Sequence, residues 1–123
     1  MQILVLEDCP NRTKKFKELF NGHTLEITNN ADEAIKLIND NKYDFIFLDH
    51  DLGGRVFVNS QEYDTGFRVA VYIPKSQNKD SKIVIHSWNP GGALNMKNAL
   101  KECDNVRYIP FGSFTEKIME WTQ

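Results

Sequence analysis

The chain has 123 residues, of which 15 are basic and 17 acidic, so its formal net charge is −2. Hydrophobic residues make up 41% of it, which is enough for one core, whereas the length is too short for two full domains. The composition therefore predicts a single domain over residues 1–123, and the balanced charge excludes a general nucleic-acid-binding or anionic-membrane-binding protein.

The N-terminal part of the chain alternates between strand-like and helix-like segments. Residues 3–6 form a continuous apolar run, which is typical of a strand buried on both faces. Pro10 suits the first turn of a helix that follows. Residues 23–28 alternate between polar and apolar side chains, as an edge strand with one wet face does. Asn30, three residues before Glu33, then opens a second helix with a capping-box pattern.

The rest of the chain continues this alternation. Three further runs have strand character: residues 45–48, 83–85 and 106–109. Three segments have apolar side chains at helical spacing: residues 65–73, the segment that opens at Asn89 and Pro90, and the segment that follows the capping box of Ser113 and Glu116. Five strand–helix units joined by right-handed crossovers predict an α/β fold, namely a three-layer, doubly wound, flavodoxin-like sandwich around a parallel five-stranded sheet.

The connection after the third predicted strand is unusually long. Residues 50–64 separate that strand from the next helix, whereas connections in α/β units usually take about 2–6 residues. Long connections of this kind are commonly functional, so we expect a lid over residues 50–64. Arg55 within it, together with Trp88, is a candidate for holding a phosphate and stacking on a base, although packing of the loop explains the aromatic residues equally well.

Acidic side chains follow two of the predicted strands at the point where each strand ends. Ligands of open α/β sheets bind outside the carboxyl ends of the strands. Carboxylates gathered there repel one another unless a cation neutralises them. The sequence therefore predicts a divalent-metal site of Glu7, Asp8 and Asp49, with Asp51 as an additional ligand. Oxygen donors favour Mg²⁺, while nearby imidazoles leave Mn²⁺ or Zn²⁺ open, and the alternative is a set of solvated capping acids.

Two histidines join the acids at neighbouring strand ends. His50 follows the third predicted strand and His86 follows the fourth. An imidazole with a pKa near ~6.5 suits proton transfer at neutral pH, and it also ligates metals. We predict that His86, or otherwise His50, acts as general acid or base. Metal ligation and a purely structural role in the loops are the alternatives.

The turn that opens the fourth predicted helix has features of a phosphate site. An N-cap and a proline start account for Asn89 and Pro90, but Gly91 and Gly92 exceed what capping requires. The two glycines would let backbone N–H groups approach a phosphate, and the helix dipole would add attraction. The phosphate site and a simple helix start are equally good interpretations of this turn.

Three strings of the chain together resemble the receiver domain of two-component response regulators: residues 3–8, 45–49 and 83–87. The resemblance implies a strand order of 2-1-3-4-5, with Glu7 and Asp8 as the acidic metal pair, Asp49 as the phosphoacceptor and Ser87 as the conserved hydroxyl. The chain departs from the receiver pattern at Ile109, where receivers carry a lysine, and at Val106, which matches their aromatic switch position.

Two further strings resemble a receiver-derived family, the cyclic-phosphate processing receivers: residues 48–54 and residues 86–90. The resemblance implies a metal-dependent phosphoesterase that acts on a small phosphorylated ligand or a cyclic phosphate, for example on a nucleotide or an RNA end. The catalytic candidates would be Asp49, His86, His50 and Ser87. Two other functions stay open: a stand-alone receiver that is phosphorylated on Asp49, and a non-catalytic module that binds a phosphorylated ligand or a protein.

The sequence also bears on the location of the protein. No apolar run approaches the ~20 residues of a membrane span, and a basic leader is missing from the N-terminus, so we expect neither a membrane anchor nor a signal peptide. Cys9 and Cys103 lie outside any metal-ligand spacing. We expect two buried thiols in a reducing cytoplasm, with a disulfide as the less favoured alternative.

Overall fold

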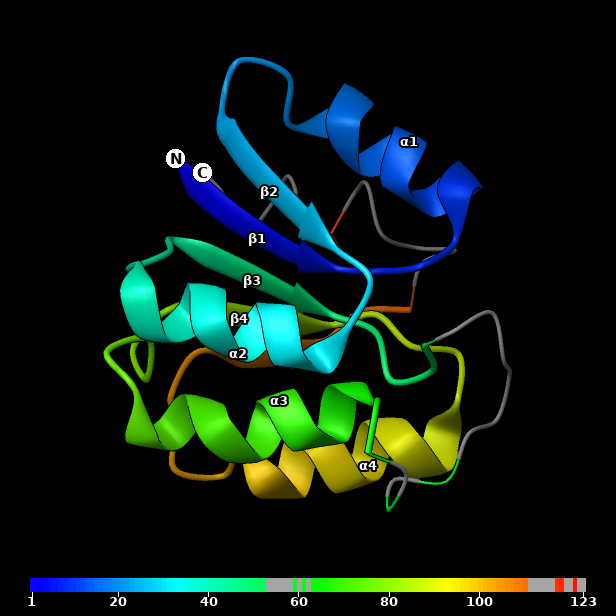
Figure 1. Ribbon diagram of the computed structural model, residues 1–123, viewed down its shortest axis with the longest axis vertical. Coiled ribbons are helices and arrows are strands. Elements are labelled where there is room, and N and C mark those ends of the chain that lie inside the picture. Colours follow the sequence, from blue (N-terminus) through cyan, green and yellow to red (C-terminus); the bar gives the residue numbers. More distant parts are fainter. Residues whose placement is uncertain (53–58, 60, 62, 111–116, 119–120, 122–123) are drawn as a thin grey trace.

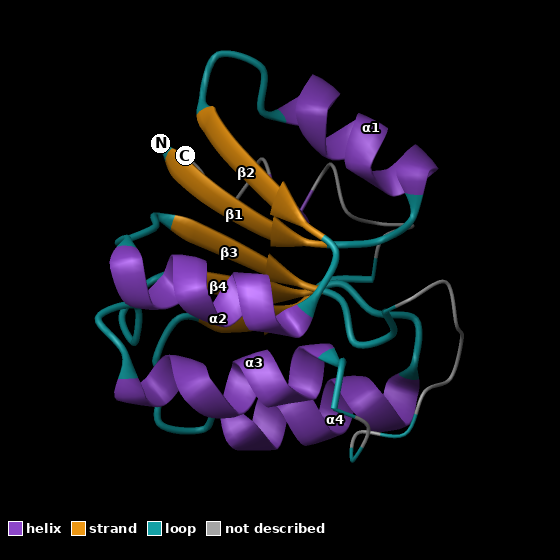
Figure 2. Ribbon diagram, viewed as in Figure 1, coloured by secondary structure: helices purple, strands orange, loops and turns teal. Residues whose placement is uncertain are grey.

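Five parallel strands form one sheet in the order β2-β1-β3-β4-β5. The computed structural model describes residues 1–52, 59, 61, 63–110, 117–118 and 121. The strands are β1 (Gln2–Leu6), β2 (Thr24–Thr28), β3 (Phe45–Leu48), β4 (Lys82–Ile85) and β5 (Val106–Tyr108). The arrowheads of β1, β2 and β3 in Figure 2 point in the same direction, as the parallel pairing requires. The predicted fold class and strand order are confirmed.

Four α-helices connect the strands within the described part of the chain: α1 (Pro10–Leu19), α2 (Ala31–Asp40), α3 (Gly66–Tyr72) and α4 (Pro90–Ala99). A short 3₁₀ helix, η1 (Ile73–Lys75), extends α3, and α3 and α4 lie side by side (Figure 1). The Asn30 side chain accepts a hydrogen bond from the backbone N–H of Glu33 at 2.8 Å, which confirms that α2 starts at the predicted cap. Most of the last predicted helix lies outside the described residues.

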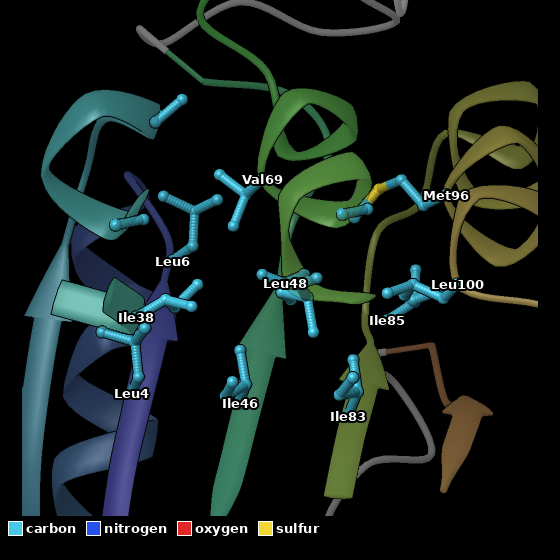
Figure 3. Packing of buried hydrophobic residues seen from close by; sticks show 14 of the residues in the cluster. Leu4, Leu6, Ile38, Ile46, Leu48, Val69, Ile83, Ile85, Met96 and Leu100 are labelled. Carbon is cyan, nitrogen blue, oxygen red and sulfur yellow. The ribbon is translucent and has the colours of Figure 1, made fainter. Parts of the chain in front are cut away.

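The strands bury both faces, and alternate residues enter two separate cores. Leu4 and Leu6 of β1 belong to a cluster formed with α2, α3 and α4, shown in Figure 3. Ile3 and Val5 belong to a second cluster, formed with Phe16 of α1 on the opposite face. Burial on both faces explains why the central strands are continuous apolar runs, and it holds their carboxyl ends in one fixed arrangement.

The described ends of the predicted lid are tied to the domain. Asp51 and Thr65 form an isolated antiparallel bridge, and Asp64 accepts a hydrogen bond from the backbone N–H of Ala31, the first residue of α2, at 2.8 Å. Asp64 therefore satisfies one of the unpaired amides at the start of α2. Residues 53–58, 60 and 62 of this segment lie outside the described residues, so the lid stays a prediction.

The two cysteines are both free thiols. Cys103 is buried as expected, whereas Cys9 is only half-buried because it lies at the exposed start of α1, where it is the N-cap residue. None of the helices in the described ranges is long and apolar enough to cross a membrane.

Candidate metal and phosphate site

Glu7, Asp49 and His86 immediately follow three neighbouring strands, β1, β3 and β4. The parallel pairing continues for one residue past the strand ends: the N–H of Asp49 donates to the carbonyl of Leu6 at 3.1 Å, and the N–H of His86 donates to the carbonyl of Leu48 at 3.0 Å. This register brings the three buried side chains together. Their potential ligand atoms all lie within 4.8 Å of one another.

Glu7 is held in the ionised state by its neighbours. One carboxylate oxygen lies 3.0 Å from Nε2 of His86, and the other accepts the backbone N–H groups of Asp8 and Cys9 at 3.0 and 3.1 Å. Burial by itself raises the pKa of this carboxyl. The hydrogen bond and charge of His86, the Cys9 amide and the charge of Arg12 outweigh burial and lower the Glu7 pKa to about 2.

Asp49 shows the opposite behaviour. Burial first, and then the negative charge of neighbouring Glu7, raise the pKa of Asp49 to about 8, despite the Arg12 charge and a 2.9 Å hydrogen bond from the His50 amide. At neutral pH the pair therefore carries one negative charge and one proton. A divalent cation would offset the repulsion between the two carboxylates, and both could then ionise.

Arg12 lies at this site, although the sequence analysis did not name it. Its Nη1 atom lies 3.4 Å from Oε1 of Glu7 and 3.7 Å from Oδ2 of Asp49. Its guanidinium carbon lies 4.8 Å from the ring centroid of Trp88. Helix dipoles disfavour a cation in the first turn, where Arg12 lies and where α1 has no acidic residue. An unfavourably placed basic residue in the first turn of a helix, five residues after Glu7, is the sequence feature that could have pointed to Arg12.

The two histidine rings are fully buried, each with 0% exposure. His86 packs edge-on against Phe16, and burial lowers its pKa although Glu7 opposes the shift. His50 directs Nδ1 toward Oδ1 of Asp51 at 2.8 Å, and Nδ2 of Asn89 donates to the same Asp51 oxygen at 3.0 Å. His86 therefore belongs to the carboxylate cluster, whereas His50 belongs to a separate polar group with Asp51 and Asn89.

The two glycines at the start of α4 have different environments. A Cβ atom at Gly92 would lie 2.6 Å from Cδ2 and 2.7 Å from Nδ1 of His50, so the ring occupies the space that a side chain would need. The N–H of Gly92 donates to Oδ1 of Asn89 at 3.0 Å, which is an ordinary N-cap. Packing against His50 thus accounts for Gly92 without a phosphate, while Gly91 is exposed at the helix start.

Ser87 and Trp88 follow His86 along the same strand end. Ser87 is buried, its Oγ accepts the N–H of Asn89 at 3.0 Å, and its carbonyl accepts the hydroxyl of Tyr108 at 3.0 Å. Trp88 is 58% exposed, which is high for a large aromatic side chain beside a buried polar cluster. Trp88 is therefore accessible from solvent while its ring contacts Arg12.

The sequence profile of one protein family, described as the cyclic-phosphate processing receiver domain, matches residues 3–102. The chain belongs to the cyclic-phosphate processing receiver family. No curated protein matches the chain significantly. The match includes the segments that carry Glu7, Asp49 and His86, so the clustered residues lie within the family domain.

Solved receiver structures share the fold of this cyclic-phosphate processing receiver. A response regulator from Burkholderia pseudomallei, solved with a phosphorylated aspartic acid, a calcium ion and citrate, has a TM-score of 0.72 at 21% identity and covers 99% of this chain, which spans 66% of that protein. The receiver domain of a sensor histidine kinase from Pseudomonas aeruginosa, with magnesium in its active-site cleft, has a TM-score of 0.72 at 18% identity, with 99% and 93% of the two chains covered. TrrA from Thermotoga maritima, in complex with Mg²⁺ and BeF, has a TM-score of 0.67 at 25% identity, with 99% and 98% covered.

The remaining predicted ligands of this cyclic-phosphate processing receiver lie around the cluster. Asp8 is half-buried and lines a cavity of about 420 Å³ between α1 and the start of α2, together with Lys17 and Glu33. Asp51 is engaged with His50 and Asn89, as described above. Neither acid belongs to the three-residue donor group found in the described ranges, and Arg55 lies outside those ranges. The ligand roles of Asp8 and Asp51 stay predictions.

Ile109, which replaces the receiver lysine, points into the core of this cyclic-phosphate processing receiver. It is 3% exposed, its N–H donates to the carbonyl of Ile85 at 2.9 Å, and it packs in the same apolar cluster as Phe16 and Ile118. The residue after β5 therefore contributes an apolar side chain to the core. A positive charge beside Glu7 and Asp49 comes instead from Arg12, in α1 near the N-terminus.

Proposed function

We propose that this receiver-like domain is a divalent-metal-dependent phosphoesterase that processes cyclic phosphates. The carrying observation is the buried cluster of Glu7, Asp49 and His86, whose ligand atoms lie within 4.8 Å of one another. The description of the family supports a cyclic phosphate as the substrate class. The host compartment we propose is the cytoplasm, where the two free thiols of the chain are stable.

The donor set of the cluster fits a divalent cation. Two carboxylates and one imidazole suit Mg²⁺ or Mn²⁺, and the imidazole favours Mn²⁺ more than an all-oxygen site would. The raised pKa of Asp49 follows from the same geometry and agrees with this fit, because the buried pair lacks the charge that would ionise both carboxyls. A bound cation polarises a phosphoryl oxygen and lowers the pKa of a coordinated water.

The protein's own groups then divide the work. Glu7 is ionised and oriented by His86 and by two backbone amides, so it needs no reorganisation before it binds a cation. Asp49 lies beside it as nucleophile or ligand. An imidazole that ligates the cation does not also transfer the proton. We therefore assign the proton transfer at the phosphoryl group to the pair of His50 and Asp51 where His86 is a ligand, and to His86 where it is not; Asp51 is the more exposed member of the pair.

A stand-alone receiver is the second candidate function. Asp49 follows β3 directly and lies beside the carboxylate of Glu7, and the Burkholderia response regulator of the same fold contains a phosphorylated aspartic acid. Against it, the buried Ile109 replaces the receiver lysine, and His86 adds an imidazole to the acidic pair. We therefore place the phosphoesterase first and the non-catalytic binding module third.

One experiment separates these functions. The protein is mixed with Mg²⁺ or Mn²⁺ and offered a 2′,3′-cyclic nucleotide or, separately, acetyl phosphate, and ³¹P NMR follows the products. Ring opening that is lost in Asp49→Asn and in His86→Gln, but kept in Glu102→Gln, a change at an exposed position between α4 and β5, supports the phosphoesterase. An acyl-phosphate signal from acetyl phosphate, without ring opening, supports the receiver. The absence of both signals would leave only the binding module.

A further inference from the structure

Arg12 has a position that charge balance alone does not explain. It lies in the first turn of α1, where the helix dipole opposes a cation, and its side chain is 20% exposed although it reaches two buried carboxylates. Both ion pairs are made by the same atom, Nη1, at 3.4 and 3.7 Å. The guanidinium thus extends from the buried cluster to the surface.

The ring of Trp88 also contacts this guanidinium. Its ring centroid lies 4.8 Å from the guanidinium carbon, within the range of a cation–π contact. Trp88 is 58% exposed as a residue, so it is not a core residue that happens to meet Arg12. Stacking on an aromatic face restricts the rotamers of an arginine and leaves its planar N–H groups oriented, which lowers the entropic cost of binding an anion.

The charges of the cluster of Glu7, Asp49 and His86 suggest a role for Arg12 in attracting an anion. The two carboxylates of Glu7 and Asp49, once ionised, would balance the formal charge of a bound divalent cation, so a further positive charge beside them would add to the attraction for an anionic phosphate. Guanidinium groups bind phosphate oxygens through several N–H donors at once. Among the described residues, Arg12 is the lysine or arginine that forms ion pairs with both carboxylates.

We propose that Arg12, held in place by Trp88, binds the phosphoryl oxygens of the anionic substrate at this site. The ligand class is a phosphate ester, either a cyclic diester or its monoester product. The inference rests on the proposed function of the site. In the ligand-free state Arg12 pairs with Glu7 and Asp49, so it competes with the metal; once a metal is bound, the same guanidinium pairs with the phosphate.

The test uses two binding measurements that do not require turnover. Calorimetry measures the affinity for Mn²⁺ alone, and then for inorganic phosphate at saturating Mn²⁺. We expect Arg12→Gln to bind Mn²⁺ more tightly and phosphate about tenfold more weakly, because a charge-assisted hydrogen bond is lost. Trp88→Ala should weaken phosphate binding while Trp88→Phe keeps most of it. Lys15→Gln, an exposed cation on the same helix, is the matched control and should change neither affinity.

The outcomes separate this inference from the proposed function. If Arg12→Gln binds phosphate as tightly as the parent protein, or if the parent binds no phosphate at all, Arg12 is only a counter-ion and the inference is overturned, even if the protein hydrolyses cyclic phosphates. If phosphate binding depends on Arg12 but no ester is hydrolysed, the inference stands and the phosphoesterase proposal fails. Arg12→Lys keeps the charge without the planar fork, so it should bind phosphate with an intermediate affinity, which also tests the idea should Arg12→Gln not fold.

Discussion

Metal binding to this domain should release a proton from Asp49. Burial and the charge of Glu7 raise the pKa of Asp49 to about 8, so at pH 7 about nine-tenths of the molecules carry a proton there that a cation must displace. Each pKa unit above the working pH costs about 1.4 kcal/mol, and apparent metal affinity should therefore be about tenfold lower at pH 7 than its plateau above pH 8, and about a further tenfold lower at pH 6. The affinity rises with pH because the metal binds the ionised carboxylate.

Isothermal titration calorimetry in two buffers of different ionisation enthalpy measures this release directly. We expect close to one proton per Mn²⁺ at pH 7 and almost none at pH 9. Asp49→Asn should abolish the release, while Glu102→Gln should keep it. An affinity that stays constant from pH 6 to pH 8, with no proton released, would refute this account of the pair.

Three further predictions follow from the same contacts. Because folding raises the Asp49 pKa to about 8, the free energy of unfolding of the metal-free protein should fall by about 5 kcal/mol as pH rises from about 4 to about 8. Asp49→Asn should remove most of this decline, so urea titrations with a chelator should show a large gain at pH 8 and little at pH 4; equal gains at both pH values would contradict it. Gly92→Ala should lower the free energy of unfolding by about 1–3 kcal/mol, because its Cβ meets the His50 ring. Gly91→Ala should leave it unchanged or raise it by up to about 1 kcal/mol through helix propensity. Equal effects of the two substitutions would rule out the packing argument. His86→Gln should weaken Mn²⁺ binding more than Mg²⁺ binding by calorimetry, and an equal loss for both metals would show that the imidazole is not a ligand.

The fold could be predicted because its central strands are buried on both faces. Residues 3–6, 45–48 and 83–85 read as continuous apolar runs, and the structure places them at the centre of the sheet, between two apolar clusters. The edge strand β2 is more exposed than the central strands, and its apolar residues Leu25 and Ile27 are partly buried against the second apolar cluster. The last strand was predicted one residue too long, because apolar character continues to Ile109. β5 ends at Tyr108, which pairs with Ile85, and Ile109 only donates its N–H to the carbonyl of Ile85.

The site could be predicted only where it follows from strand ends. Glu7 and Asp49 meet because parallel strands end at one edge, and His86 joins them for the same reason. The role of Arg12 depends on how α1 folds back beside β3, which brings it near a residue 37 positions away in the sequence. The role of Gly92 likewise depends on the ring of His50. Contacts of this kind join distant segments, and no local pattern encodes them.

The most direct test of the phosphoesterase proposal is the rate at which the protein opens a 2′,3′-cyclic nucleotide, followed by ³¹P NMR as the metal is titrated. We predict a monoester signal that grows with Mn²⁺ or Mg²⁺, stops when a chelator is added, and falls by about a hundredfold or more in Glu7→Gln and Asp49→Asn. Hydrolysis that persists at full rate in the chelator, or in both variants, would contradict the assignment of this cluster as the catalytic centre, and so would the absence of any monoester with either metal.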